Sequence, residues 1–292
     1  MPRSSSTNPL APKVKKGENP FKVRANKYVE PDVEPLVHVI DKAKRIRCDT
    51  EKRGHSTPEG RSPLEIAVDA SEGFIPLWAE GKTLRWSFRE SSLQFFADPA
   101  AAKAEIKTMI GEAMVLWGDA APVKLAQRDD NWDFEVIVRQ NDDCDINGCV
   151  LASAFFPDGG RHQLTLYPKM FEQEREEQVE TLIHEIGHIF GLRHFFALIG
   201  ETAWPAEIFG EHDSFSIMNY GALSELSEND KSDLKKLYAL AWSGELTKIN
   251  GTPIRFMTPF HESGEPVEDL IALEPAEVRL PTRRRGYARR VA

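Results

Sequence analysis

A predicted helix with two histidines one turn apart, closed by a glycine and followed by a third histidine, constrains this chain more than any other feature. The run HEIGHIFGLRH occupies residues 184–194. At ~100° per residue, His184 and His188 lie on one helix face, so both imidazoles can reach one metal ion. Gly191 can end the helix in a left-handed turn that brings His194 towards the same point. The run predicts three imidazole ligands and an open fourth position, the arrangement of a catalytic zinc site.

The residue after the first histidine is a carboxylic acid. Glu185 lies about 60° round the helix from His188, where its carboxylate reaches a water on the metal better than the metal itself. That is the position of a general base. The alternative is a set of ordinary helix histidines, but the helix already has an apolar core face on its other side, formed by Val179, Leu182, Ile183, Ile186, Ile189 and Phe190. We therefore predict His184, His188 and His194 as metal ligands and Glu185 as catalytic.

The apolar residues around the motif alternate between helix and strand periodicity. The motif helix is expected over Gln173–Leu192, and a second amphipathic helix over Ala101–Trp117, where apolar residues recur every three or four positions. Strands are expected where apolar and polar residues alternate between turn-rich segments, at Leu84–Phe88, Phe134–Val138, Val150–Phe156 and Gln163–Tyr167. This order predicts an α/β fold with a mixed sheet of four or five strands.

Composition divides the chain into three parts. The net charge of −9 hides an acidic centre, because residues 62–278 hold 17 Lys/Arg against 38 Asp/Glu. Residues 1–61 are basic, begin with a Pro-rich stretch and should be largely irregular. We expect the folded domain over residues 62–241 and an extension with an Arg-rich end over residues 242–292. The lack of a long apolar run argues against a membrane span or a secretory signal, and three cysteines exclude a small disulfide scaffold.

The extended motif resembles that of the metzincin clan of zinc endopeptidases. The run SIMNYG at residues 216–221 is similar to the clan's methionine turn, in the Met-x-Tyr form of astacins and serralysins. By this resemblance Tyr220 stabilises the transition state beside the zinc. Residues 149–157 look like the edge strand that borders the substrate cleft in matrixins, and residues 227–238 look like the final matrixin helix.

This resemblance covers roughly residues 80–241 and implies the metzincin fold. That fold has a twisted mixed sheet, a backing helix, an active-site helix and an irregular C-terminal subdomain closed here by a helix near Glu228–Leu240. Two departures leave the subfamily unassigned: Phe195 after the third histidine, and a long loop over residues 195–217. His162 stands where matrixins begin a second, structural zinc site, but the other ligands do not align, so we expect no such site.

Weaker signals involve a short acidic loop and the cysteines. Asp143, Asp145 and Asn147 match the start of an EF-hand loop that lacks its final Glu, which leaves a looser calcium site or a plain acidic turn. Cys144 and Cys149 could close a small disulfide loop, but without a secretory signal free thiols are favoured. The Arg-Cys pair ending at Cys48 is similar to the matrixin pro-segment whose thiolate blocks the zinc. An incidental tail cysteine is favoured here, because the flanking Pro and Gly are missing.

Together these observations predict a zinc-dependent metalloendopeptidase that cleaves internal bonds of protein or peptide substrates. The alternative is a zinc-retaining binding protein whose cleft is capped by the loop over residues 195–217. A third reading, polyanion binding by the arginines of residues 283–290, is disfavoured because the acidic domain would repel nucleic acid. We expect no membrane association. The compartment stays open between the cytoplasm and non-classical export, with an extracellular site implied by the resemblance, and the oligomeric state is not predicted.

Overall fold

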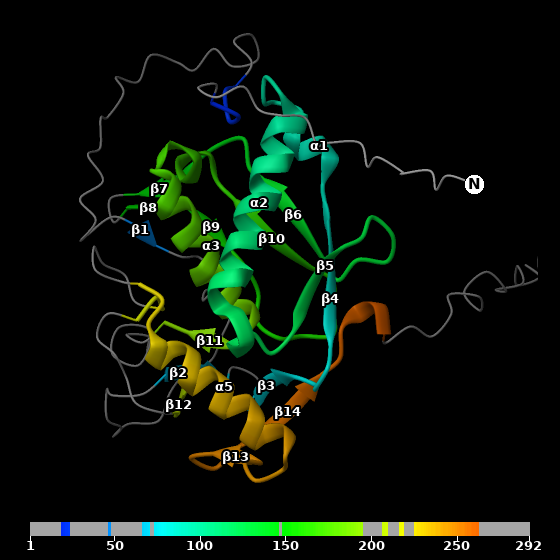
Figure 1. Cartoon of the computed structure of the whole chain (residues 1–292), viewed down its shortest axis with the longest axis vertical. Coiled ribbons are helices and arrows are strands. Elements are labelled where there is room, and N and C mark those ends of the chain that lie inside the picture. The colour runs from blue at the N-terminus through cyan, green and yellow to red at the C-terminus, as the bar shows by residue number, and fades with distance from the viewer. Residues whose placement is uncertain are drawn as a thin grey trace, which may run out of the picture.

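The computed structural model describes residues 73–194 almost continuously, together with several other segments of the chain (Figure 1). The described residues are 19–23, 46–47, 66–70, 73–145, 148–194, 206–209, 216–218 and 225–262. Within these ranges, no helix is both long and apolar enough to cross a bilayer.

One five-stranded sheet forms the upper part of the molecule. Its order is β5 (Lys124–Gln127), β4 (Thr83–Phe88), β6 (Phe134–Val138), β10 (His162–Leu166) and β9 (Ala152–Ser153). The first four strands run parallel, and β9 pairs antiparallel with β10 at the edge. The predicted mixed sheet of four or five strands is therefore confirmed, but the strand expected over Val150–Phe156 contributes only Ala152–Ser153 to its edge.

Two long helices cover this sheet side by side, as Figure 1 shows. Helix α2 (Pro99–Trp117) begins at Asp98, whose side chain accepts a hydrogen bond from the Ala101 N–H, and Pro99 occupies its first turn. Helix α3 (Arg175–Ile189) carries the histidine motif. The indole N–H of Trp117, at the end of α2, donates to the Ile183 carbonyl in α3 at 3.1 Å. The backing helix and the active-site helix are thus both found where they were predicted, and their apolar faces share one core.

The lower part is built from short strands and one helix. Helix α5 (Glu228–Trp242) starts with a capping box between Ser227 and Asp230, and it lies across the ends of β3 and α3. Two three-stranded sheets lie nearby: β11 (Leu192–Arg193), β2 (Ile66–Asp69) and β12 (Ala206–Phe209), and then β13 (Lys248–Ile249), β14 (Thr252–Met257) and β3 (Ile75–Trp78). Four short helical turns also occur: α1 (Glu90–Leu93), η2 (Gly118–Ala120), η3 (Pro168–Glu172) and η4 (Phe260–Glu262).

The fold continues past residue 241, where the sequence predicted an extension. Strand β14 pairs in parallel with β3 in the register Ile254–Ile75 to Met257–Trp78. Beyond it, the His261 ring nitrogen Nδ1 lies 2.8 Å from the buried carboxylate of Asp133. Residues up to 262 therefore pack against the folded part of the chain that precedes residue 241.

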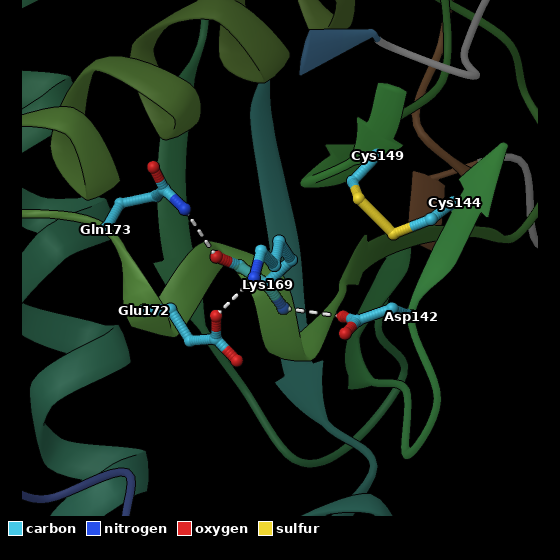
Figure 2. The surroundings of a disulfide bond; sticks show 6 residues. All are labelled: Asp142, Cys144, Cys149, Lys169, Glu172 and Gln173. Atoms are coloured by element: carbon cyan, nitrogen blue, oxygen red, sulfur yellow. Dashed lines mark hydrogen bonds and ion pairs between the residues drawn. A yellow bond between two sulfur atoms is a disulfide. The ribbon is translucent and has the colours of Figure 1, made fainter. Parts of the chain in front are cut away.

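The preference for free thiols is wrong, because Cys144 and Cys149 form a disulfide (Figure 2). The two cysteines lie opposite each other in the antiparallel pair of β7 (Asp143–Asp145) and β8 (Gly148–Val150), with their Cα atoms 4.0 Å apart. A strand β1 (Ile46–Arg47) pairs in parallel with β8 on its other side. Beside the disulfide, the Lys169 backbone N–H donates to the Asp142 carboxylate at 2.7 Å. The sequence alone showed only the five-residue spacing, which does not reveal the hairpin register.

Candidate active site

The three predicted histidine ligands meet in one buried cluster. His184 and His188 come from α3, and His194 follows β11 directly. Their side chains are almost inaccessible, with His188 and His194 at 0% exposure. The Nε2 atoms of His184 and His194 lie 2.9 Å apart, and one nitrogen from each of the three rings falls within 4.8 Å of the others. One ion can therefore contact all three rings.

Backbone carbonyls orient two of these rings. The Nδ1 of His184 lies 2.8 Å from the Ile217 carbonyl oxygen, and the Nδ1 of His188 lies 2.7 Å from the Leu192 carbonyl oxygen. A carbonyl can only accept, so each Nδ1 carries the proton and donates it. The neutral ring then presents its Nε2 lone pair as a ligand, which is the usual outer support of a metal-bound histidine. This all-imidazole donor set fits Zn²⁺.

The turn after α3 delivers the third histidine. Gly191 has a φ of +94°, a conformation that side-chain-bearing residues rarely adopt, and its N–H donates to the His188 carbonyl at 2.8 Å. The chain then enters β11, which pairs antiparallel with β2 in the register Leu192–Val68. The predicted role of Gly191 is confirmed. The contribution of β2 was not predicted, because its four residues carry no sign of their distant partner.

The described part of the methionine turn lies directly beneath the histidines. Met218 is 3% exposed, and the preceding Ile217 supplies the carbonyl that orients His184. Asp230 at the start of α5 holds this turn: its carboxylate accepts from the Ser216 hydroxyl at 2.6 Å and from the Ile217 N–H at 3.3 Å. Asp230, the third residue of α5, therefore supports the first ligand through Ile217.

Gly187 is a glycine because the methionine turn leaves no room for a side chain. A Cβ atom built there would lie 2.5 Å from the Met218 sulfur. We expect Gly187→Ala to lower the free energy of unfolding by about 1–3 kcal/mol, because Met218 is buried and must move. Gly111→Ala in α2 is the matched control, since its Cβ would meet nothing within 4 Å. That variant should gain roughly 0.5–1 kcal/mol. Denaturant unfolding of both variants measures the difference, and an equal gain at both positions would contradict the packing argument.

Glu185 is buried beside the ligands. It follows His184 on α3 and is 2% exposed. A carboxylate so enclosed is costly unless the site uses or compensates its charge, and a neighbouring divalent cation would do so.

Several other predicted features fall outside the described residues. These are Tyr220, Phe195, Cys48, the Arg-rich end and part of the proposed calcium loop, whose residues 146 and 147 are not described. His162, by contrast, is placed: its ring stacks on Phe155 at 4.4 Å between centroids, and its Nε2 lies 3.0 Å from the Asp158 carboxylate.

A helix that presents two histidines and a buried glutamate, followed by a glycine turn and a third histidine, defines a zinc metallopeptidase site. Residues 78–200 match the family model described as Matrixin. No match was found among the curated protein sequences. Among solved structures, the chain is similar to one described as the structure of myroilysin, at 15% identity, with a TM-score of 0.38, covering 59% of this chain and 98% of that one.

Proposed function

We propose that this zinc metallopeptidase cleaves internal peptide bonds with Glu185 as its general base. The observation that carries the proposal is the position of Glu185, which is buried on the helix that presents His184 and His188 of the three-histidine cluster. A site that only stored zinc would not need a buried carboxylate beside its ligands.

The residues of the chain divide the chemistry among themselves. A zinc ion held by His184, His188 and His194 supplies Lewis acidity for the scissile carbonyl and a water nucleophile at neutral pH. Glu185 accepts the proton of the attacking water and passes it to the nitrogen of the departing amine. The carbonyls of Ile217 and Leu192 keep the His184 and His188 rings in place throughout.

We propose that the substrate binds as an extended strand beside the edge strand β9. Within the described residues β9 pairs only with β10, so its other side can accept a further strand. The chain after β9 reaches the metal site, because the Phe156 ring packs edge-on against His188 with centroids 5.5 Å apart. An extended polypeptide paired with β9 would therefore pass the histidine cluster. Protein and peptide substrates fit this arrangement.

Tyr220 is proposed to hold the developing oxyanion, as its place in the Met-x-Tyr sequence implies. We expect Tyr220→Phe to leave zinc content unchanged and to lower kcat by roughly 10–10³-fold, the effect of losing one oxyanion donor. Steady-state kinetics on a peptide substrate tests this. A change confined to KM would instead make Tyr220 part of the substrate-binding wall.

A mixed peptide library tests the proposed function as a whole. We expect the zinc-loaded protein to cut within peptides and not only at their ends, and we expect much slower cleavage by Glu185→Gln. The alternative, a non-catalytic zinc-binding protein, gains some support from the pairing of β12 with β2, which organises part of the loop after His194. Zinc binding without cleavage of any peptide would favour that alternative.

The disulfide bears on where the protein acts. Disulfides persist in oxidising compartments and are rare in the cytosol. The Cys144–Cys149 bond therefore supports the proposal that the protein acts outside the cytoplasm. Thiol titration of protein isolated from its natural host under alkylating conditions tests this, and free thiols at both cysteines would contradict it.

A further inference from the structure

The carbonyls at the end of the active-site helix are bound by side chains from two other elements. The last four carbonyls of an α-helix have no partner within the helix. Here the indole N–H of Trp78 in β3 donates to the Ile189 carbonyl at 2.7 Å. The hydroxyl of Tyr238 in α5 donates to the next carbonyl, that of Phe190, at 2.9 Å. Both donors are only 1% exposed, so water does not compete for these carbonyls.

The two donors are also tied to each other. The Tyr238 hydroxyl accepts a hydrogen bond from the Trp78 backbone N–H at 3.2 Å. The Trp78 carbonyl in turn accepts from the Trp242 indole at 2.9 Å. Burial raises the pKa of Tyr238 well above its ordinary value, so its hydroxyl keeps its proton and donates throughout the neutral range. Trp78 and Tyr238 therefore act as one rigid pair, and we call them the carbonyl clamp.

The clamp holds the end of α3, directly before the Gly191 turn that leads to the third ligand, His194. His184 and His188 belong to α3 and keep their positions as long as the helix exists. His194 lies beyond the Gly191 turn, so its position depends on how that turn is held. On the near side of the turn the clamp fixes Ile189 and Phe190, and on the far side β2 fixes Leu192. A Cβ atom at Gly191 would lie 3.3 Å from the Pro76 carbonyl, so β3 also abuts the turn itself.

We propose that Trp78 and Tyr238 are positioning residues for the zinc site, which place His194 by binding the Ile189 and Phe190 carbonyls. This inference rests on the proposed function, in which the cluster holds zinc. Neither residue is a ligand or touches the reacting atoms. Tyr238 comes from α5, outside the residues 78–200 that match the Matrixin model, so the site also depends on a side chain from the C-terminal part of the fold.

The test compares zinc retention in variants that differ by one hydrogen-bond donor. Tyr238→Phe keeps the ring and removes the hydroxyl, and Trp78→Phe removes the indole N–H. We expect each variant to lose zinc to a chromogenic chelator about tenfold faster than the parent protein, the scale seen when an outer support of a metal ligand is removed. Trp86→Phe is the control, because it shrinks a buried indole in β4 that packs on Phe88 and Phe134.

A spectroscopic measurement separates positioning from general destabilisation. With Co²⁺ in place of zinc, the visible absorption bands report the ligand number and geometry. We expect altered bands for Tyr238→Phe and parental bands for Trp86→Phe at matched extents of folding. Equal zinc loss and equal spectra for these two variants would overturn the clamp while leaving the peptidase function intact. A parent protein that binds no zinc would instead overturn the proposed function.

Discussion

Replacing Glu185 with glutamine should lower kcat for peptide cleavage by roughly 10²–10⁴-fold, the contribution of a well-placed general acid–base group. Glutamine has nearly the same shape but cannot accept the proton of the attacking water. The three histidines lie in a cluster that does not include Glu185, so the variant should bind zinc as the parent does. Kinetics of the zinc-loaded protein, with the metal content measured on the same sample, tests both halves of this expectation.

Glu176→Gln is the matched control for this experiment. Glu176 lies on the exposed first turn of the same helix, far along the axis from His184. The Glu176→Gln substitution makes the same chemical change to α3 but should leave kcat unaltered. If Glu185→Gln retained full turnover, another group would have to serve as the base, and the buried carboxylate would be structural. If it lost zinc as well as activity, the kinetic loss could not be assigned to proton transfer.

The parts of the site that could be predicted from sequence are those set by local geometry. The spacing of His184 and His188 fixes their common face, because helix periodicity alone brings residues i and i+4 together. Gly191 predicted the turn because its backbone freedom is a property of the residue itself. The strands β4, β6 and β10 of the central sheet followed from alternation in the same way, whereas β5 was not predicted. In each case the observation and its consequence lie within a few residues of each other.

The pairing of strands that lie far apart in the chain could not be predicted from the sequence. Nothing in four residues of β2 indicates that they pair with both β11 and β12, and β14 carries no mark of its register with β3. The disulfide was misjudged because the lack of a secretory signal was given more weight than the cysteine spacing, and only the hairpin of β7 and β8 shows Cys144 and Cys149 facing each other. Partner choice of this kind depends on packing between distant segments, which periodicity does not encode.

The residues that support the histidines were recognisable only as core candidates. Trp78 and Tyr238 are large and buried, so a sequence reading assigns them to packing. Yet each also carries a donor, and a buried indole N–H or phenol O–H must find an acceptor. The acceptors are the carbonyls at the end of α3. A buried Trp or Tyr near a helix that carries metal ligands is therefore a signal worth testing as a support of that site.

Replacing His194 with alanine should remove nearly all bound zinc, because two imidazoles on one helix turn cannot retain the ion against a chelator. Its nitrogen is part of a buried three-ring cluster that contains no carboxylate to take its place. His162→Ala is the control, since that ring stacks on Phe155 and bonds to Asp158 away from the cluster, and it should keep the metal. Metal analysis after dialysis against a weak chelator makes the comparison. Normal zinc content in His194→Ala would mean that the third ligand is an Asp or Glu from residues 205–230, and the three-histidine assignment would then fail.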